Sequence, residues 1–242
     1  MASTTAEFED FINDAMRIIK LGEEKGIILR LLGHCAIRFH CPNHSYLYEK
    51  MKRPPTDIDF MTYSKTSSKL KKFFTELGFV PDEFIIARYG HKRHIYYDKE
   101  KNRTIDVFID KLSMCHTIDF RGRLELDYPT ITPSDLLLEK LQIVKITEKD
   151  IKDVIVLLLE HEVGEVEKET INMKYIAKLL SKDWGFYYTV TTNLSKIKEL
   201  LDRFEALTDE DKKTVTERID KLVDAIEKEL SLIHISEPTR PY

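Results

Sequence analysis

The residues that most constrain the fold of this chain are aspartates inside two short runs with strand-like alternation. Alternation of polar and apolar residues is typical of a half-buried strand, in which every second side chain points to the same face. Residues 56–60 therefore place Asp57 and Asp59 on one face of a strand, and residues 104–108 place Asp106 on the corresponding face of another. The residues expected to enter a core are Ile58, Phe60, Ile105 and Val107. If the two strands are neighbours, three carboxylates converge on one side of a sheet.

Such a group of carboxylates is costly, because like charges in a partly desolvated place raise one another's pKa unless a cation lies between them. Mg²⁺ and Mn²⁺ are hard cations that prefer oxygen ligands, and Mg²⁺ is commonly held by a few carboxylates together with substrate phosphates. We therefore predict a phosphoryl-transfer metal site with Asp57, Asp59 and Asp106 as ligands. The alternative is that Asp57 and Asp59 form the solvated face of an edge strand, with Asp106 an unrelated surface residue.

A glycine turn precedes the acidic pair. An apolar stretch beginning at Gly26 turns at Gly33 into residues with helical character. A glycine at such a turn lets the backbone approach a ligand closely, and a helix N-terminus presents free N–H groups to phosphate. The turn is therefore the predicted triphosphate-binding element.

The turn at Gly33, the pair Asp57 and Asp59, and the later Asp106 together resemble the nucleotidyltransferase superfamily that includes DNA polymerase beta. That family has a Gly-Gly or Gly-Ser turn opening a helix, then a strand with two acidic residues, then a third acidic strand. The long spacing between the turn and the acidic pair is most similar to AbiEii-type abortive-infection toxins and their minimal relatives. The chain departs from the pattern at His34, where the family has Gly or Ser.

The resemblance also implies roles for residues after the sheet. AbiEii-like proteins carry a lysine on a helix there, followed by an acidic helix motif, and the matching residues are Lys140 and Asp150. Lys140 would contact the nucleotide phosphates and Asp150 would lie at the mouth of the site, with Gly33, His34 and Arg53 completing the nucleotide-binding set. Taken without the resemblance, Lys140 is a solvated helix residue and Asp150 belongs to a first helical turn that the helix dipole stabilises.

The implied activity is transfer of a nucleoside monophosphate from an NTP to a hydroxyl acceptor. Two Mg²⁺ or Mn²⁺ ions about 3.5–4 Å apart would be held by the aspartates, and pyrophosphate would leave. The acceptor implied by the toxin resemblance is tRNA or another RNA, and the partner is a cognate antitoxin protein. Two alternatives stay open: an inactive binding module on the same fold, motivated by His34, and an enzyme acting on a small molecule such as an aminoglycoside.

The overall charge gives no general reason to bind nucleic acid, because the formal net charge is -4. Contact with RNA would therefore need a local patch. The best candidate is the lysine-rich face of a helix predicted over residues 64–77, formed by Lys65, Lys69, Lys71 and Lys72. Lesser candidates for phosphate contact are Arg53, Arg88, Lys92 and Arg93, with surface solvation as the alternative role for most of them.

The composition is that of an ordinary globular protein, with 42% hydrophobic and 33% charged residues. The sequence has neither an apolar run of membrane-spanning length nor a signal-peptide hydrophobic region, so we expect a cytoplasmic protein. The 3 cysteines are odd in number and agree with a reducing compartment. Residues 34–44 contain Cys and His in zinc-ligand numbers, but structural zinc sites usually combine two separated pairs of ligands.

The predicted fold class is α/β, with a mixed nucleotidyltransferase-type sheet and flanking helices followed by a helical domain. The expected catalytic domain spans residues 1–132 and the helical domain spans residues 133–229. Residues 230–242 resemble the translation of a sequencing-library adapter and are excluded from the fold. Strands are predicted at 27–32, 85–89, 94–97 and around the aspartates; helices are predicted at 8–20, from Gly33, at 46–51, 64–77, 134–146, 148–160, 171–180, 193–207 and 208–229. Ser134 and Thr208 are the expected N-caps, and the aromatic residues at 184–188 are expected to pack at a helix junction.

Overall fold

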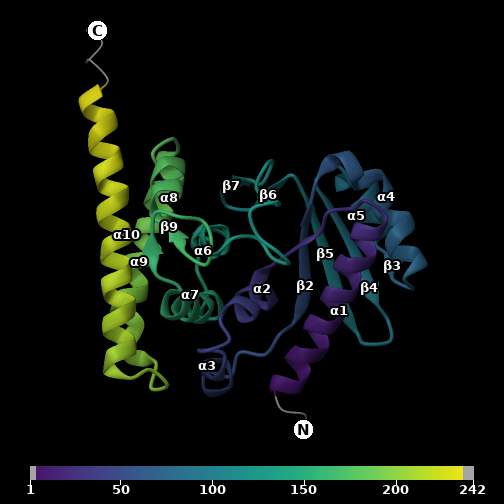
Figure 1. Ribbon diagram of the computed structural model, residues 1–242, viewed down its shortest axis with the longest axis horizontal. Coiled ribbons are helices and arrows are strands. Elements are labelled where there is room, and N and C mark those ends of the chain that lie inside the picture. The colour runs from purple at the N-terminus through teal and green to yellow at the C-terminus, as the bar shows by residue number, and fades with distance from the viewer. Residues whose placement is uncertain (1–3, 237–242) are drawn as a thin grey trace. The chain divides into compact units, whose positions relative to one another are not determined.

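The computed structural model describes the backbone of residues 4–236 and the side chains of residues 8–232. The chain divides into two compact units, residues 1–132 and residues 133–242, which are described separately (Figure 1). None of the helices in the described part of the chain is long and apolar enough to cross a membrane.

Unit 1 is built on a mixed five-stranded sheet in the order β1-β2-β5-β4-β3. The strand β2 pairs antiparallel with β1 and parallel with β5, whereas β4 pairs antiparallel with both β5 and β3. The predicted mixed α/β class is therefore confirmed. The strands are β1 (Arg30–Leu32), β2 (Asp57–Thr62), β3 (Val80–Pro81), β4 (Arg93–Asp98) and β5 (Arg103–Ile109).

One face of this sheet forms the core of unit 1. Ile58 and Phe60 of β2 stand beside Ile105 and Val107 of β5, and all four are at most 1% exposed. On β4, Tyr96 lies opposite Ile105, and its ring stacks on Phe74 with the two centroids 4.3 Å apart. Phe74 belongs to α4 (Ser64–Glu76), whose apolar side covers this face. The alternation read from the sequence therefore fixes which face is buried.

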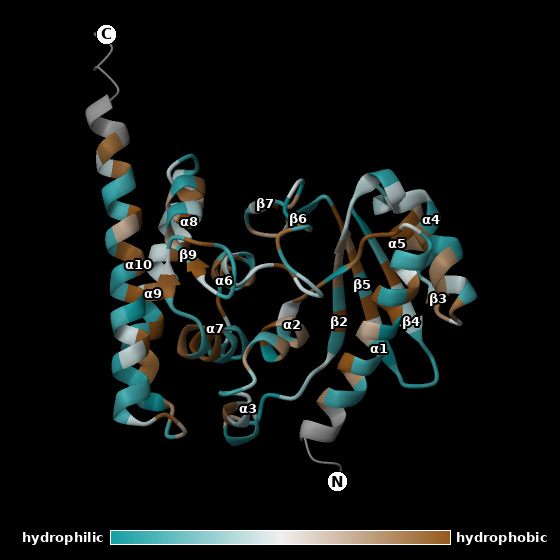
Figure 2. Cartoon of the chain, viewed as in Figure 1, coloured by the Kyte–Doolittle hydropathy of each residue, from teal (hydrophilic) through white to brown (hydrophobic). Residues whose placement is uncertain are grey.

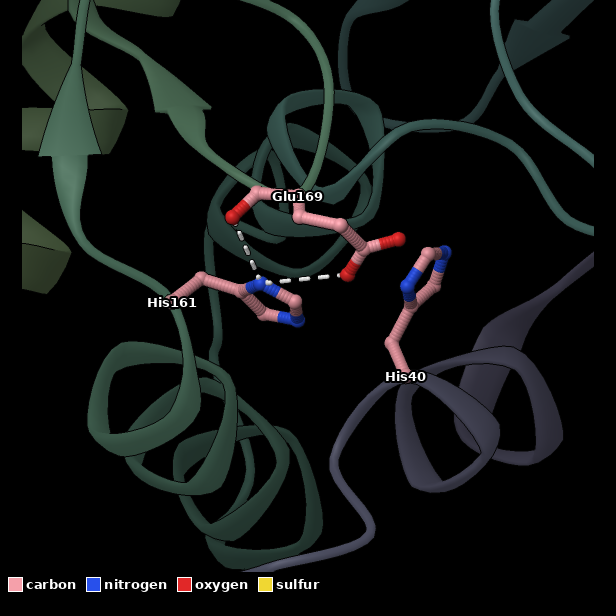
Figure 3. Close-up of side chains that lie close together, drawn as sticks. All are labelled: His40, His161 and Glu169. Atoms are coloured by element: carbon pink, nitrogen blue, oxygen red, sulfur yellow. Dashed lines mark hydrogen bonds and ion pairs between the residues drawn. The ribbon is translucent and has the colours of Figure 1, made fainter.

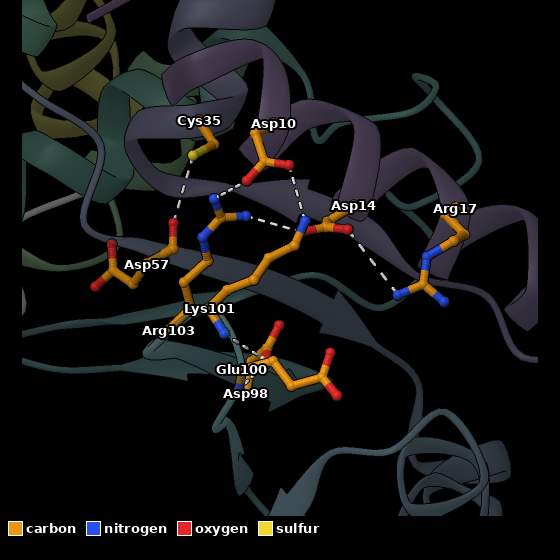
Figure 4. A network of polar contacts seen from close by, with 9 residues as sticks. All are labelled: Asp10, Asp14, Arg17, Cys35, Asp57, Asp98, Glu100, Lys101 and Arg103. Atoms are coloured by element: carbon orange, nitrogen blue, oxygen red, sulfur yellow. Dashed lines mark hydrogen bonds and ion pairs between the residues drawn. The ribbon is translucent and has the colours of Figure 1, made fainter. Parts of the chain in front are cut away.

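The helix α1 (Thr4–Glu24) is tied to the beginning of β5 by an ionic network (Figure 4). Arg103 places its guanidinium carbon 3.8 Å from the ring centroid of Phe11 and its Nη1 2.8 Å from Asp14 Oδ2, and it also pairs with Asp10. Lys101 Nζ lies 2.8 Å from Asp10 Oδ1 and 2.6 Å from Asp14 Oδ2. The network fixes the strand that carries Asp106 at its N-terminal end.

The shorter helices of unit 1 agree with the sequence except at one place. The helix predicted from the glycine turn is α2 (Gly33–His40), and the single turn predicted at 46–51 is α3 (Tyr46–Lys50). The strand predicted at 85–89 is wrong, because these residues belong to the helix α5 (Glu83–Tyr89). The helix forms because the Asp82 carboxylate accepts a hydrogen bond of 2.9 Å from the Ile85 amide, which caps its first turn. A small antiparallel pair, β6 (Lys111–Ser113) and β7 (Thr117–Asp119), follows β5.

Unit 2 is mainly helical. In Figure 2 both α7 and α10 carry hydrophobic and hydrophilic residues, and the two kinds alternate along α10. The helix α7 buries eight residues, in agreement with a core position. The elements are α6 (Pro133–Leu141), α7 (Glu148–Glu160), β8 (Val163–Gly164), β9 (Ile171–Asn172), α8 (Met173–Leu180), α9 (Trp184–Leu200), η1 (Leu201–Arg203) and α10 (Asp209–Ser236).

The predicted N-caps of unit 2 have different outcomes. Thr208 caps α10 as predicted, since its Oγ1 accepts from the Asp211 amide at 3.1 Å while its amide donates to Asp211 Oδ2 at 2.9 Å. Ser134 is not a cap, because α6 already begins at Pro133 and the Ser134 hydroxyl accepts from the Asn172 amide at 2.7 Å.

Two further predictions for unit 2 need correction. The helix predicted at 193–207 begins earlier, at Trp184, because the Asp183 carboxylate caps it through the Phe186 amide. Within the aromatic cluster Phe186 packs as expected at 1% exposure, but Trp184 and Tyr188 are 72% and 56% exposed and stack on each other. The helix α10 continues through Ser236, and residues 237–242 of the adapter-like segment lie outside the described residues.

Candidate functional site

The strands β2 and β5 bring the predicted acidic residues onto one face of unit 1. In their parallel register Asp59 is the partner of Asp106, and Asp57 is the partner of Thr104. Since in-register residues of neighbouring strands point to the same side, the three carboxylates share the face opposite the core. The strand adjacency expected from the sequence is therefore present.

Burial and a neighbouring cation determine the charge state of Asp106. Its side chain is 9% exposed, and this burial raises the pKa of the carboxyl, with a further upward contribution from Asp57. Arg93 of β4 opposes both effects by donating from Nε to the two carboxylate oxygens at 2.7 and 2.9 Å, and Nη2 also contacts Oδ2. The net effect is a raised pKa of Asp106.

Arg93 also restricts how the carboxylates can converge. Among the described side chains, these three aspartates do not bring one oxygen each within 4.8 Å of one another. Asp106 is instead bound in the bidentate arrangement that guanidinium and carboxylate favour, while the guanidinium carbon lies 5.2 Å from the Phe108 ring centroid. The sequence predicts for Arg93 only a lesser role in phosphate contact. No local signal in the sequence reveals the closer role, because it depends on the pairing of β4 with β5, in which Arg93 lies two residues before Ile95, the partner of Asp106.

The glycine turn lies directly against the acidic pair. Gly33 has φ of +75°, and a Cβ placed on it would stand 2.5 Å from Asp59 Oδ2. Glycine is required here for both reasons, because an L side chain is strained at this φ and would displace the carboxylate. The turn and Asp59 therefore form one compact structure at the start of α2.

His34 and Arg53, predicted as nucleotide-binding residues, are buried in unit 1. The His34 ring is 3% exposed and meets the Tyr48 ring edge to face, with centroids 4.7 Å apart. Arg53 is 5% exposed and donates from Nη1 to the Pro54 carbonyl at 2.8 Å. The departure at His34 thus has a local packing role, in which the imidazole fills space between α2 and α3.

Lys140 and Asp150 come close together within unit 2. Lys140 Nζ lies 3.9 Å from Asp150 Oδ1, 3.4 Å from Asp153 Oδ2 and 3.5 Å from Glu139 Oε1. Asp150 also completes a capping box, since its Oδ2 accepts from the Thr147 amide at 3.2 Å and its amide donates to Thr147 Oγ1 at 3.5 Å. The ammonium group is thus surrounded by carboxylates, and Asp150 has the structural role of a first-turn acid.

The possible zinc ligands have other contacts. Cys35 is buried as expected, and its thiol donates to the Asp57 carbonyl at 3.4 Å. Among the described side chains, no three donors from residues 34–44 gather into a metal site. His40 lies 2.5 Å from Thr130 Oγ1, and in unit 2 His161 Nδ1 lies 3.1 Å from the Glu169 carbonyl and 3.8 Å from its carboxylate (Figure 3).

Comparisons with protein-family models, with curated proteins and with solved structures gave no match to this chain.

Proposed function

We propose that unit 1 is the catalytic part of a nucleotidyltransferase that depends on Mg²⁺ or Mn²⁺. It would transfer a nucleoside monophosphate from an NTP to a hydroxyl acceptor, with tRNA or another RNA as the acceptor class. The observation that carries this proposal is the register of β2 and β5, which places Asp57, Asp59 and Asp106 on one face. The proposal also includes a nucleotidyltransferase-type arrangement of the sheet, a cytoplasmic location and a cognate antitoxin as partner.

The donor chemistry of this face fits a hard divalent cation. The carboxylate oxygens of Asp57 and Asp59 are ligands of the kind that Mg²⁺ prefers, and the close approach of Gly33 leaves a backbone turn beside them. A bound metal would supply neutralisation of phosphate charge and a lower pKa for the acceptor hydroxyl. The Asp106 carboxylate would contact both this metal and Arg93.

The remaining roles belong to the protein's own groups. Gly33 would admit the triphosphate close to the backbone, and the amides that begin α2 would donate to its oxygens. Lys140 and Asp150 belong to unit 2, and the roles that the sequence implies for them stay predictions, as does phosphate contact by Arg53. His34 would act through the packing of α2 on α3, because its ring lies against Tyr48.

One observation favours a second candidate, the non-catalytic nucleotide-binding module. The guanidinium of Arg93 already neutralises Asp106, which in the enzymatic proposal must bind a cation. A protein with this fold but without transferase activity would keep the Arg93–Asp106 ion pair at all times. The distinction depends on whether Asp106 is needed for turnover.

The test is incorporation of label from each α-labelled NTP into a panel of tRNAs and into aminoglycosides, with Mg²⁺ or Mn²⁺ and with chelator, beside a measurement of NTP binding. We expect metal-dependent transfer that Asp57→Asn, Asp59→Asn and Asp106→Asn each abolish while circular dichroism stays unchanged. Full activity of any one variant would refute the role of that residue. Absence of transfer to RNA and to aminoglycosides, together with retained NTP binding, would establish the non-catalytic module.

A further inference from the structure

A cavity of about 460 Å³ opens in unit 1 among α5, β4, β5 and β6. It lies on the same face of the sheet as the carboxylates, since its lining includes Arg93 and Phe108, which are register partners on β4 and β5. Its size is within the usual range for a site that takes one small ligand or one nucleotide. The cavity is lined in part by two aromatic residues and three cations: Tyr89, Phe108, Lys92, Arg93 and Lys111.

The lining is cationic, in contrast to the net charge of -4 of the whole chain. Lys92, Arg93 and Lys111 face a single lining carboxylate, Asp110, which also accepts from the Ser64 amide at 2.9 Å. Lys111 Nζ is 3.7 Å from Asp119, and Lys92 makes no ion pair with any described residue. Arg93 uses Nε and Nη2 on Asp106, so its Nη1 keeps two donors for another acceptor.

The same cavity offers flat apolar surfaces. Tyr89 is 43% exposed at the end of α5, and Phe108 lies beneath the Arg93 guanidinium. Aromatic faces beside lysine and arginine are the combination with which proteins hold the base and phosphate of a single-stranded nucleotide. A polycationic ligand such as an aminoglycoside would be repelled by the three cations.

We infer that this cavity binds a nucleoside phosphate, either as a free mononucleotide or as the terminal residue of a single-stranded RNA. The phosphate would be held by Lys92, Lys111 and the free edge of Arg93, and the base would stack on Tyr89 or Phe108. Since Arg93 bridges the cavity and Asp106, a nucleotide bound here would lie beside the carboxylates. The role of this nucleotide as the acceptor rests on the proposed function, whereas its binding in the cavity does not.

The experiment measures binding of the full chain to a fluorescein-labelled single-stranded RNA pentamer by anisotropy, at several salt concentrations, with 5′-AMP as competitor. We expect Lys92→Gln and Lys111→Gln each to reduce the slope of log affinity against log salt by about 0.7, the value for one lost contact to a single strand. Tyr89→Ala should weaken binding roughly fivefold or more through lost stacking. Lys99→Gln is the matched control, since Lys99 is also an exposed lysine of unit 1 but lies outside the cavity. Lys72→Gln tests the rival site, the lysine-rich face of α4.

The outcomes separate this inference from the proposed function. Competition by 5′-AMP identifies a mononucleotide site, whereas RNA binding without such competition identifies the terminal residue of RNA; either supports the inference when the cavity variants lower affinity. If Lys72→Gln lowers the salt slope and the cavity variants do not, or if neither probe binds, the inference is wrong. Asp59→Asn should keep RNA binding while losing transfer. Binding in the cavity can therefore be established even if the protein shows no transfer activity.

Discussion

At the scale of single residues, Arg93 determines the state of the candidate metal site. A carboxylate that is 9% exposed requires a counter-charge, and the Arg93 guanidinium supplies it. A divalent ion that bound Asp106 would have to share the carboxylate with Arg93 or displace it. Arg93 would therefore compete with any cation for the Asp106 carboxylate.

The positive φ of Gly33 and its close approach to Asp59 each contribute to the cost of a substitution, and the two contributions can be measured separately. Gly33→Ala should cost about 1–2 kcal/mol for the positive φ and more for the displaced Asp59 carboxylate. Gly26→Ala is the matched control, since Gly26 has φ of +68° and an added Cβ there meets nothing within 4 Å. Urea unfolding of both variants measures the difference, and equal losses would show that the contact with Asp59 contributes nothing.

His94 makes the stability of unit 1 depend on pH. Burial lowers its pKa, while its Nε2 donates to the Gly90 carbonyl at 2.9 Å and its Nδ1 accepts from Tyr96 at 2.8 Å. Because the unfolded chain takes up a proton more readily, stability is complete above the ordinary histidine pKa of about 6.5 and is lost as pH falls through the folded pKa. We expect His94→Gln to flatten this loss in unfolding curves recorded from about 1 unit above to about 1.5 units below that ordinary pKa. The exposed His91→Gln should leave the slope as in the unsubstituted protein, and an unchanged slope in His94→Gln would contradict the assignment.

At the scale of elements, the attachment of α1 to β5 depends on a few partly buried charges. Arg103 is 11% exposed and Asp14 is 15% exposed, so removal of the arginine leaves carboxylates without their main partner. Arg103→Ala should lower the free energy of unfolding by about 2 kcal/mol, and combination with Asp14→Ala should cost less than the sum of the two. Lys99→Ala, at an exposed position of the same hairpin, is the control. Additive losses in chemical denaturation would mean that the pair does not couple.

Element types followed from the sequence where periodicity and local chemistry agreed. The alternation around Asp57 and Asp106 predicted β2 and β5, and the glycine at 33 predicted the start of α2. The error at 85–89 arose because a short apolar run fits either a strand or a helix turn. The helix forms here because the Ile85 amide donates a capping hydrogen bond to the Asp82 carboxylate. Ser134 was misread because a proline can itself occupy the first helical position.

At the scale of the whole molecule, the chain divides at the residue where its sequence becomes helical, Pro133. The sequence could predict which acidic residues share a face, because strand parity is a local property. It could not predict that Arg93 would bind Asp106, since that contact depends on how β4 pairs with β5. Nor could it predict that Lys140 would be surrounded by Glu139, Asp150 and Asp153 within unit 2.

Divalent metal should stabilise the whole chain if the carboxylate face binds it. A ligand that binds only the folded state adds about 2.7 kcal/mol at a concentration one hundred times its dissociation constant, so the thermal midpoint should rise with Mg²⁺ or Mn²⁺. The formal net charge of -4 means that divalent ions also screen general repulsion, and NaCl at matched ionic strength measures that contribution. Asp59→Asn should lose the metal-specific rise, because the variant lacks one of the proposed ligands. Arg93→Gln should show a larger rise than the unsubstituted protein, because no guanidinium then competes for Asp106. An equal rise in Asp59→Asn and in the unsubstituted protein would place the stabilising metal away from this face.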